Sequence, residues 1–205
     1  MNSRVKNIKK VLLSDNWYTL NKVIFDYQMQ NGQWVEQARE AYDRGNGATV
    51  LLYNKEKHTV ILIRQFRMPT FLNGNTSGMM VETCAGVLDG DDPETCVIKE
   101  AEEESGYRVH DVEKVFEAYM SPGAVTEILH FYIAQYKDED KVGAGGGLDS
   151  EQEDIEVLEV DFDRAMNMMA TGEIKDAKTI MLLQYAQNNN LFDQVEGSGR
   201  RNDKK

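Results

Sequence analysis

Cysteine, proline and histidine are scarce in this chain of 205 residues, which has two cysteines, three prolines and three histidines. Two cysteines are too few for a disulfide scaffold, so we expect Cys84 and Cys96 to be buried, reduced thiols. The histidines are dispersed and the cysteines form no zinc-binding pattern. The chain also has no apolar run long enough to cross a membrane, which excludes a helical membrane protein.

Charge of one sign dominates, because the formal net charge is −12 and the sequence pI is near 4.7. This balance argues against nucleic-acid polymers and anionic membranes as partners. A small anionic substrate remains possible if local cations and a metal ion offset the field. The first ten residues contain no apolar stretch that resembles a signal peptide, so we expect a cytoplasmic protein.

The N-terminal part is predicted to form a small antiparallel sheet over residues 1–44. Asn31-Gly32 is a strong hairpin signal, and it separates two strand-like runs, WYTLNKVIFDYQM and WVEQAREAY. Glycines at 45 and 47 mark the start of the main domain, which we assign to residues 45–191. Residues 192–205 are rich in glycine, serine and charge, and we expect a disordered tail there.

The main domain mixes strands with a few helices, which predicts an α+β fold or a sheet between helices. Helical periodicity is present at 162–172, with Gly172 as a stop signal, and again at 177–189. The glycine-rich segment 137–147 is predicted to be a mobile linker. Strand-like runs lie at 48–54, 59–66, 112–121, 127–136 and 153–162.

The most informative segment is GVLDGDDPETCVIKEAEEESGY at residues 86–107. Asp92 suits the N-cap of a helix that Gly106 would end. Glu100 and Glu104 are four residues apart and therefore neighbours on the helix surface, where a divalent cation would relieve their repulsion. We expect Lys99 to pair with Glu103, four residues on. The alternative is an ordinary solvated acidic helix face.

This segment resembles the Nudix box of the Nudix hydrolases, in which a glycine and an acidic residue precede a basic-Glu pair and a Glu-Glu-x-Gly ending. Asp92 replaces the usual Glu, Lys99 replaces the usual Arg, and the spacer before Lys99 is one residue short. The short spacer and the lysine occur together in the GDP-mannose hydrolase subfamily. Segments similar to that subfamily run from about residue 5 to about residue 190, including LLSDNWYTL, AYDRGNGATVLLYN, YMSPGAVTE and TGEIKDAKT.

The resemblance implies an α/β/α sandwich, and a homodimer that exchanges the N-terminal sheet between subunits. It also implies Mg²⁺-dependent hydrolysis of the pyrophosphate bond of GDP-mannose to GMP and mannose 1-phosphate, with Mn²⁺ as a possible substitute. An ADP-ribose or ADP-sugar pyrophosphatase is the alternative within the family. A catalytically silent nucleotide-binding module is the alternative of another class, and the intact Glu100, Glu103 and Glu104 set argues against it.

The implied metal ligands are Glu100, Glu104 and the main-chain carbonyl of Ala85, with a further carboxylate from the segment after the glycines. The subfamily pattern points to Glu153 as this metal ligand and catalytic base, and a different register would make it Glu151. A glutamate on a glycine-hinged loop could close onto the metal when substrate binds. Glu127 and then Glu103 are the next candidates for the catalytic base.

Substrate contacts are expected from cations and from one aromatic ring. Arg67 and Lys178 are candidates for the phosphates, and Lys178 sits at a helix start, where a lone cation opposes the helix dipole. Trp17 could stack on guanine, or simply pack in its hairpin. The resemblance assigns the other contacts to Glu127, Glu153, Glu104, Ala85, Gly86 and Val87, and to Arg39 and Glu40 of the partner subunit.

Overall fold

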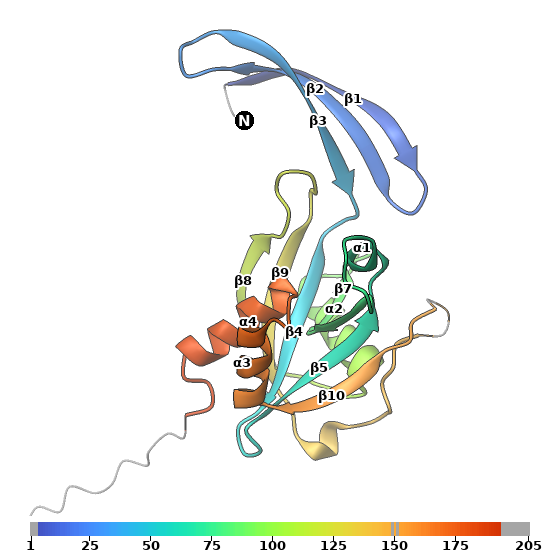
Figure 1. Cartoon of the computed structure of the whole chain (residues 1–205), viewed down its shortest axis with the longest axis vertical. Coiled ribbons are helices and arrows are strands. Elements are labelled where there is room, and N and C mark those ends of the chain that lie inside the picture. Colours follow the sequence, from blue (N-terminus) through green and yellow to red (C-terminus); the bar gives the residue numbers. More distant parts are fainter. Residues whose placement is uncertain (1–3, 149, 151, 194–205) are drawn as a thin grey trace, which may run out of the picture.

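The computed structural model describes residues 4–148, 150 and 152–193, and it contains two separate sheets (Figure 1). The first is an antiparallel sheet of β1 (Val5–Asp15), β2 (Thr19–Gln28) and β3 (Trp34–Asp43), which projects away from the rest of the chain. The sequence predicted only the hairpin of β2 and β3. The register of β1 against β2 shifts twice. The sequence of β1 therefore lacks the period-two alternation of apolar residues that reveals a strand.

The second sheet has the strand order β10-β5-β4-β9-β8, with β6 paired to β5 and β7 paired to β4. Strands β4 and β9 run parallel, and the other pairs are antiparallel. The bounds are β4 Gly47–Asn54, β5 Thr59–Phe66, β6 Met79–Glu82, β7 Cys84–Val87, β8 Val112–Tyr119, β9 Ile128–Gln135 and β10 Glu156–Asp161.

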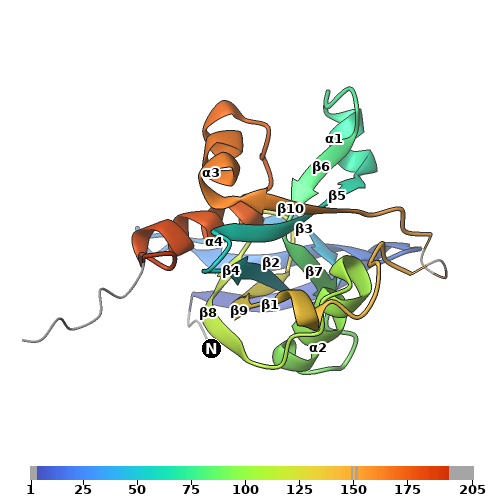
Figure 2. The same cartoon turned by 90° about the horizontal axis from the view of Figure 1, so that it is seen from below.

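Helices cover both faces of this sheet (Figure 2). Every residue of β4 is buried, and its side chains alternate between two hydrophobic clusters. Leu51 packs on the side of α3 (Phe162–Thr171) and α4 (Ala177–Asn188), whereas Val50 packs on the side of α2 (Pro93–Glu100). The predicted α/β/α sandwich of α+β type is therefore confirmed.

Three smaller features complete the fold. A short helix, α1 (Met68–Leu72), follows β5. Cys84 and Cys96 are free and buried, as expected, and burial raises the pKa of both thiols. Among the described residues, no helix is both long and apolar enough to cross a membrane.

Candidate active site

The helix of the acidic motif begins and ends where the sequence predicts. The Asp92 side chain accepts hydrogen bonds from the N–H groups of Glu94 and Thr95, both at 3.1 Å. The chain then widens into a π-helical turn at Ala101–Ser105 and stops at Gly106, whose φ is +79°. Turns of this kind are frequent at functional sites.

The expected pairing of Lys99 with Glu103 is wrong, because Lys99 forms its ion pair with Asp91 in the turn before the helix. An ion pair within one helix relies on regular spacing of the two side chains. Here the π turn begins directly after Glu100 and breaks that spacing before Glu103 is reached.

Strand β7 and the acidic helix bring Ala85, Glu100 and Glu104 together. The Ala85 N–H donates to Glu104 Oε2 at 2.9 Å. A side chain at Gly86 would overlap the Glu100 carboxylate, so only glycine lets that carboxylate lie against the strand. The main chain at Ala85 and the two carboxylates therefore form one cluster.

This cluster suits a divalent cation. Glu104 is only 2% exposed. Burial, and next the negative charge of Glu100, raise its pKa well above the usual range, and the Ala85 N–H only partly offsets them. Two neighbouring carboxylates and a backbone carbonyl are oxygen ligands, which hard cations such as Mg²⁺ prefer. The residues present therefore fit the implied metal.

The glycine-rich segment is not the mobile linker that the sequence predicted. Gly146 N–H donates to the carbonyl of Glu104 at 2.9 Å, and Gly147 N–H donates to that of Glu103 at 3.1 Å. A side chain at Gly145, whose φ is +70°, would collide with the backbone of the helix end. The glycines thus let two backbones approach closely and cap the carbonyls of the π turn.

This docked segment fixes the position of Glu153. The Leu148 N–H donates to Glu153 Oε2 at 3.0 Å, and the Glu153 side chain packs against Gly147. Glu153 lines a cavity of about 680 Å³ together with Ala85, Glu100 and Glu104. Glu151, the alternative in the other register, lies outside the described residues.

The same cavity receives side chains from both sheets. Trp17, in the turn between β1 and β2, lines it and is 83% exposed. Arg39 and Glu40 lie on β3 away from it, and the Arg39 guanidinium donates to the Gln37 side chain at 3.0 Å. Glu103 does not line the cavity either. The other predicted residues on its wall are Arg67, Gly86 and Val87.

Arg67 and Lys178 meet at a buried carboxylate that sequence reasoning missed. Glu82 Oε1 and Oε2 accept from Arg67 Nε and a terminal nitrogen, both at 2.9 Å, and Glu82 Oε2 also accepts from Lys178 Nζ at 2.6 Å. Burial alone would raise the pKa of Glu82, but Lys178 and Arg67 lower it to about 2. Asp176 Oδ1 lies 3.1 Å from Lys178 Nζ.

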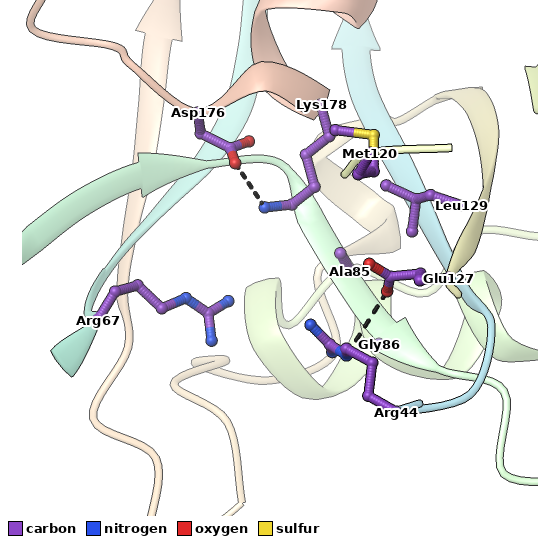
Figure 3. A pocket seen from close by; sticks show the side chains of 9 residues that line it. All are labelled: Arg44, Arg67, Ala85, Gly86, Met120, Glu127, Leu129, Asp176 and Lys178. Carbon is purple, nitrogen blue, oxygen red and sulfur yellow. Dashed lines mark ion pairs between the residues drawn. The ribbon is translucent and has the colours of Figure 1, made fainter. Parts of the chain in front are cut away.

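Arg67 and Lys178 line a smaller cavity together with Glu127 (Figure 3). Glu127 Oε1 lies 3.6 Å from Arg44 Nε, and Arg44 is a further lining residue that the sequence analysis did not select. The loop that carries Glu127 is anchored to the end of β3, because Tyr42 N–H donates to the Ala124 carbonyl at 2.8 Å.

The two cavities share Arg44, Arg67, Ala85 and Gly86, so they form one continuous site. Glu100, Glu104 and Glu153 line the larger cavity, and Lys178 lines the smaller one together with Glu127 and Asp176. The shared residues Arg44 and Arg67 place positive charge between the two groups of carboxylates. Such a site can hold a metal ion together with the oxygens of a diphosphate, which is the arrangement that phosphoanhydride hydrolysis needs.

Family comparisons agree with this chemistry. A model described as the NUDIX domain matches residues 43–183, and one described as the GDP-mannose pyrophosphatase NudK N-terminal domain matches residues 4–42. The chain belongs to the Nudix hydrolase family, whose members generally need divalent metal ions. Its relatives include the GDP-mannose pyrophosphatases of Escherichia coli O139:H28, Shigella boydii serotype 4 and Shigella dysenteriae serotype 1. Each is 54% identical over 193 residues, which cover 94% of this chain and 100% of theirs.

Proposed function

We propose that this enzyme hydrolyses the pyrophosphate bond of GDP-mannose to GMP and mannose 1-phosphate, with Mg²⁺ as the metal and Mn²⁺ as a substitute. The observation that carries the proposal is the single site in which Glu100, Glu104 and Glu153 face a cavity shared with Arg67. The names of the relatives support the choice of substrate.

Four groups would hold the metal: the carboxylates of Glu100, Glu104 and Glu153 and the carbonyl oxygen of Ala85. A metal bound there supplies neutralising charge to the phosphate oxygens and lowers the pKa of water. Glu153 accepts the proton of the attacking water. Its carboxylate accepts one N–H bond from Leu148, which holds the side chain on the cavity wall.

The rest of the site orients the substrate. Arg67 and Lys178 bind the diphosphate, Glu127 accepts hydrogen bonds from sugar hydroxyls, and the Trp17 ring stacks on guanine. The indole is 83% exposed and lies on the cavity wall, which supports a stacking role over hairpin packing.

A substrate panel tests this function. We expect kcat/KM for GDP-mannose in Mg²⁺ to exceed that for ADP-ribose by at least about tenfold. Specific contacts to the correct nucleobase contribute about 1–3 kcal/mol to this discrimination. GDP-glucose is the matched control for the sugar. A preference for ADP-ribose would make the chain an ADP-sugar pyrophosphatase, and no turnover of any member would favour the silent module.

We further propose that the enzyme is a homodimer in the cytoplasm and that the N-terminal sheet is exchanged between subunits. No described residue of β1, β2 or β3 is buried. Apolar side chains on it remain open, notably Ile8, Leu12, Leu13 and Val35. Residues 1–44 carry seven basic and five acidic side chains, so the rest of the chain has a charge of −14 that complements the sheet.

Subunit complementation tests this exchange. If Arg39 contributes to the partner's site, the Arg39→Ala homodimer and the Glu153→Gln homodimer should each have low hydrolytic activity. Mixed heterodimers then contain one site with both native residues, and we expect about a quarter of wild-type activity after subunit exchange. Light scattering at micromolar concentration gives the mass independently. A fully active monomer, or mixing that restores nothing, would contradict the exchanged dimer.

A further inference from the structure

Glu82 occupies an unusual place for a carboxylate. It is the last residue of β6, only 3% exposed, and it pairs with Ile63 across the sheet. Ionised side chains are almost never this buried unless they are paired. Here the pairing involves two cations at once, from different elements: Arg67 follows β5, and Lys178 lies in the first turn of α4.

Both carboxylate oxygens of Glu82 accept hydrogen bonds from the two cations. Arg67 binds it through two parallel hydrogen bonds of 2.9 Å, an arrangement that fixes the plane of the guanidinium. Lys178 Nζ adds a third bond at 2.6 Å, and Asp176 holds the other side of the ammonium. These carboxylates also explain how a cation is tolerated at the start of a helix, where the dipole opposes it.

Both cations keep part of their side chain toward the substrate site. The Arg67 side chain is 42% exposed while Glu82 is buried behind it. Arg67 and Lys178 line the smaller cavity (Figure 3). Glu82 does not line that cavity, but it contributes to the wall of an adjoining one that Arg67 and Lys178 also line. Because only 3% of Glu82 is exposed, it offers little surface to a ligand and would act mainly through the two cations that it holds.

We propose that Glu82 is a positioning residue that holds Arg67 and Lys178 as one rigid unit, and so aligns the diphosphate for attack. This role rests on the proposed function, because it treats the two cations as the phosphate contacts. The opposing view is simple electrostatics: Glu82 places negative charge near an anionic substrate, and its removal should strengthen anion binding.

The two views predict opposite signs for Glu82→Gln. Positioning predicts weaker binding of GDP, and a fall in kcat/KM of about 10- to 100-fold for GDP-mannose, because small misplacements of binding groups cost this much. Electrostatics alone predicts tighter GDP binding and an unchanged or higher kcat/KM. Calorimetry with GDP and steady-state kinetics, both on the full-length enzyme, measure these quantities.

A double-mutant cycle separates positioning from a general effect on the fold. If Glu82 acts through Arg67, adding Glu82→Gln to Arg67→Ala should cost less than about threefold more in kcat/KM. Equal effects in both backgrounds would overturn the proposal. Glu82→Asp keeps the charge but shortens the reach, and it replaces Glu82→Gln in the cycle if that variant does not fold.

Glu102→Gln is the matched control. Glu102 also binds an arginine through two bonds, to Arg108 Nε and a terminal nitrogen at 2.8 Å each, but this pair lies on the surface outside the cavity. We expect its kcat/KM to stay within about twofold of wild type, since exposed pairs contribute little. GDP binding and GDP-mannose turnover by the wild-type enzyme test the proposed function on their own. The variants test only the role of Glu82, so a negative result with them would not contradict the proposed function.

Discussion

Replacing Glu153 with glutamine should lower kcat by about 10²- to 10⁴-fold and leave substrate affinity within several-fold, the range that a general base supplies. Glutamine keeps the size of the side chain and can still accept from the Leu148 N–H. It cannot take a proton from water. Ground-state binding depends instead on Arg67, Lys178 and the nucleotide contacts, which the change leaves in place. Steady-state kinetics and GDP calorimetry measure the two effects.

Glu151→Gln is the control, because it removes the other carboxylate proposed for this segment. We expect a much smaller effect from it. The reverse order, with Glu151 critical and Glu153 dispensable, would show that the alternative register, which makes Glu151 the base, is the right one. If neither change mattered, the base would lie elsewhere, with Glu127 next and Glu103 after it.

Replacing Glu104 with glutamine should abolish most turnover, by at least about 100-fold, while the protein stays folded. Mutation of residues that only hydrogen-bond to a metal ligand already lowers metal affinity or activity by about 10- to 100-fold. Loss of a ligand itself should therefore lower activity further. A glutamine can keep the bond from the Ala85 N–H, which protects the fold. Near-wild-type rates in Mg²⁺ would refute the metal assignment.

The same variant should be more stable than the wild type when metal is removed at neutral pH. The folded state raises the pKa of Glu104, through burial first and the charge of Glu100 second, so its ionised form destabilises the fold. This penalty is absent below the unfolded pKa of about 4.5 and grows as pH rises above it. Melting curves in EDTA should therefore show a gain for the variant at pH 7.5 and none at pH 4.

Much of the fold follows from local signals in the sequence. Asp92, Pro93 and Gly106 bound the acidic helix, and Gly172 ends α3 with a φ of +79°. Nearly continuous apolar runs identify the central strands of the main sheet, since both of its faces are buried. These features depend on neighbours in the chain, so the sequence is enough to predict them.

Features that depend on distant partners were harder to predict. The glycines of segment 143–147 indicated flexibility, but they allow close contact with the carbonyls of Glu103 and Glu104. Glu82 was hidden in an apolar strand, and its partner Lys178 is 96 residues away. A charged residue inside a buried strand is nevertheless a usable signal, because it requires a partner of opposite charge.

The central claim is that this site cleaves the phosphoanhydride of GDP-mannose. Phosphorus NMR of the wild-type enzyme with GDP-mannose and Mg²⁺ follows both phosphates as they separate. We expect the diphosphate signals to be replaced by those of GMP and mannose 1-phosphate, and the reaction to stop in EDTA. Release of intact GDP together with free mannose, or persistence of the diphosphate signals in Mg²⁺, would contradict it.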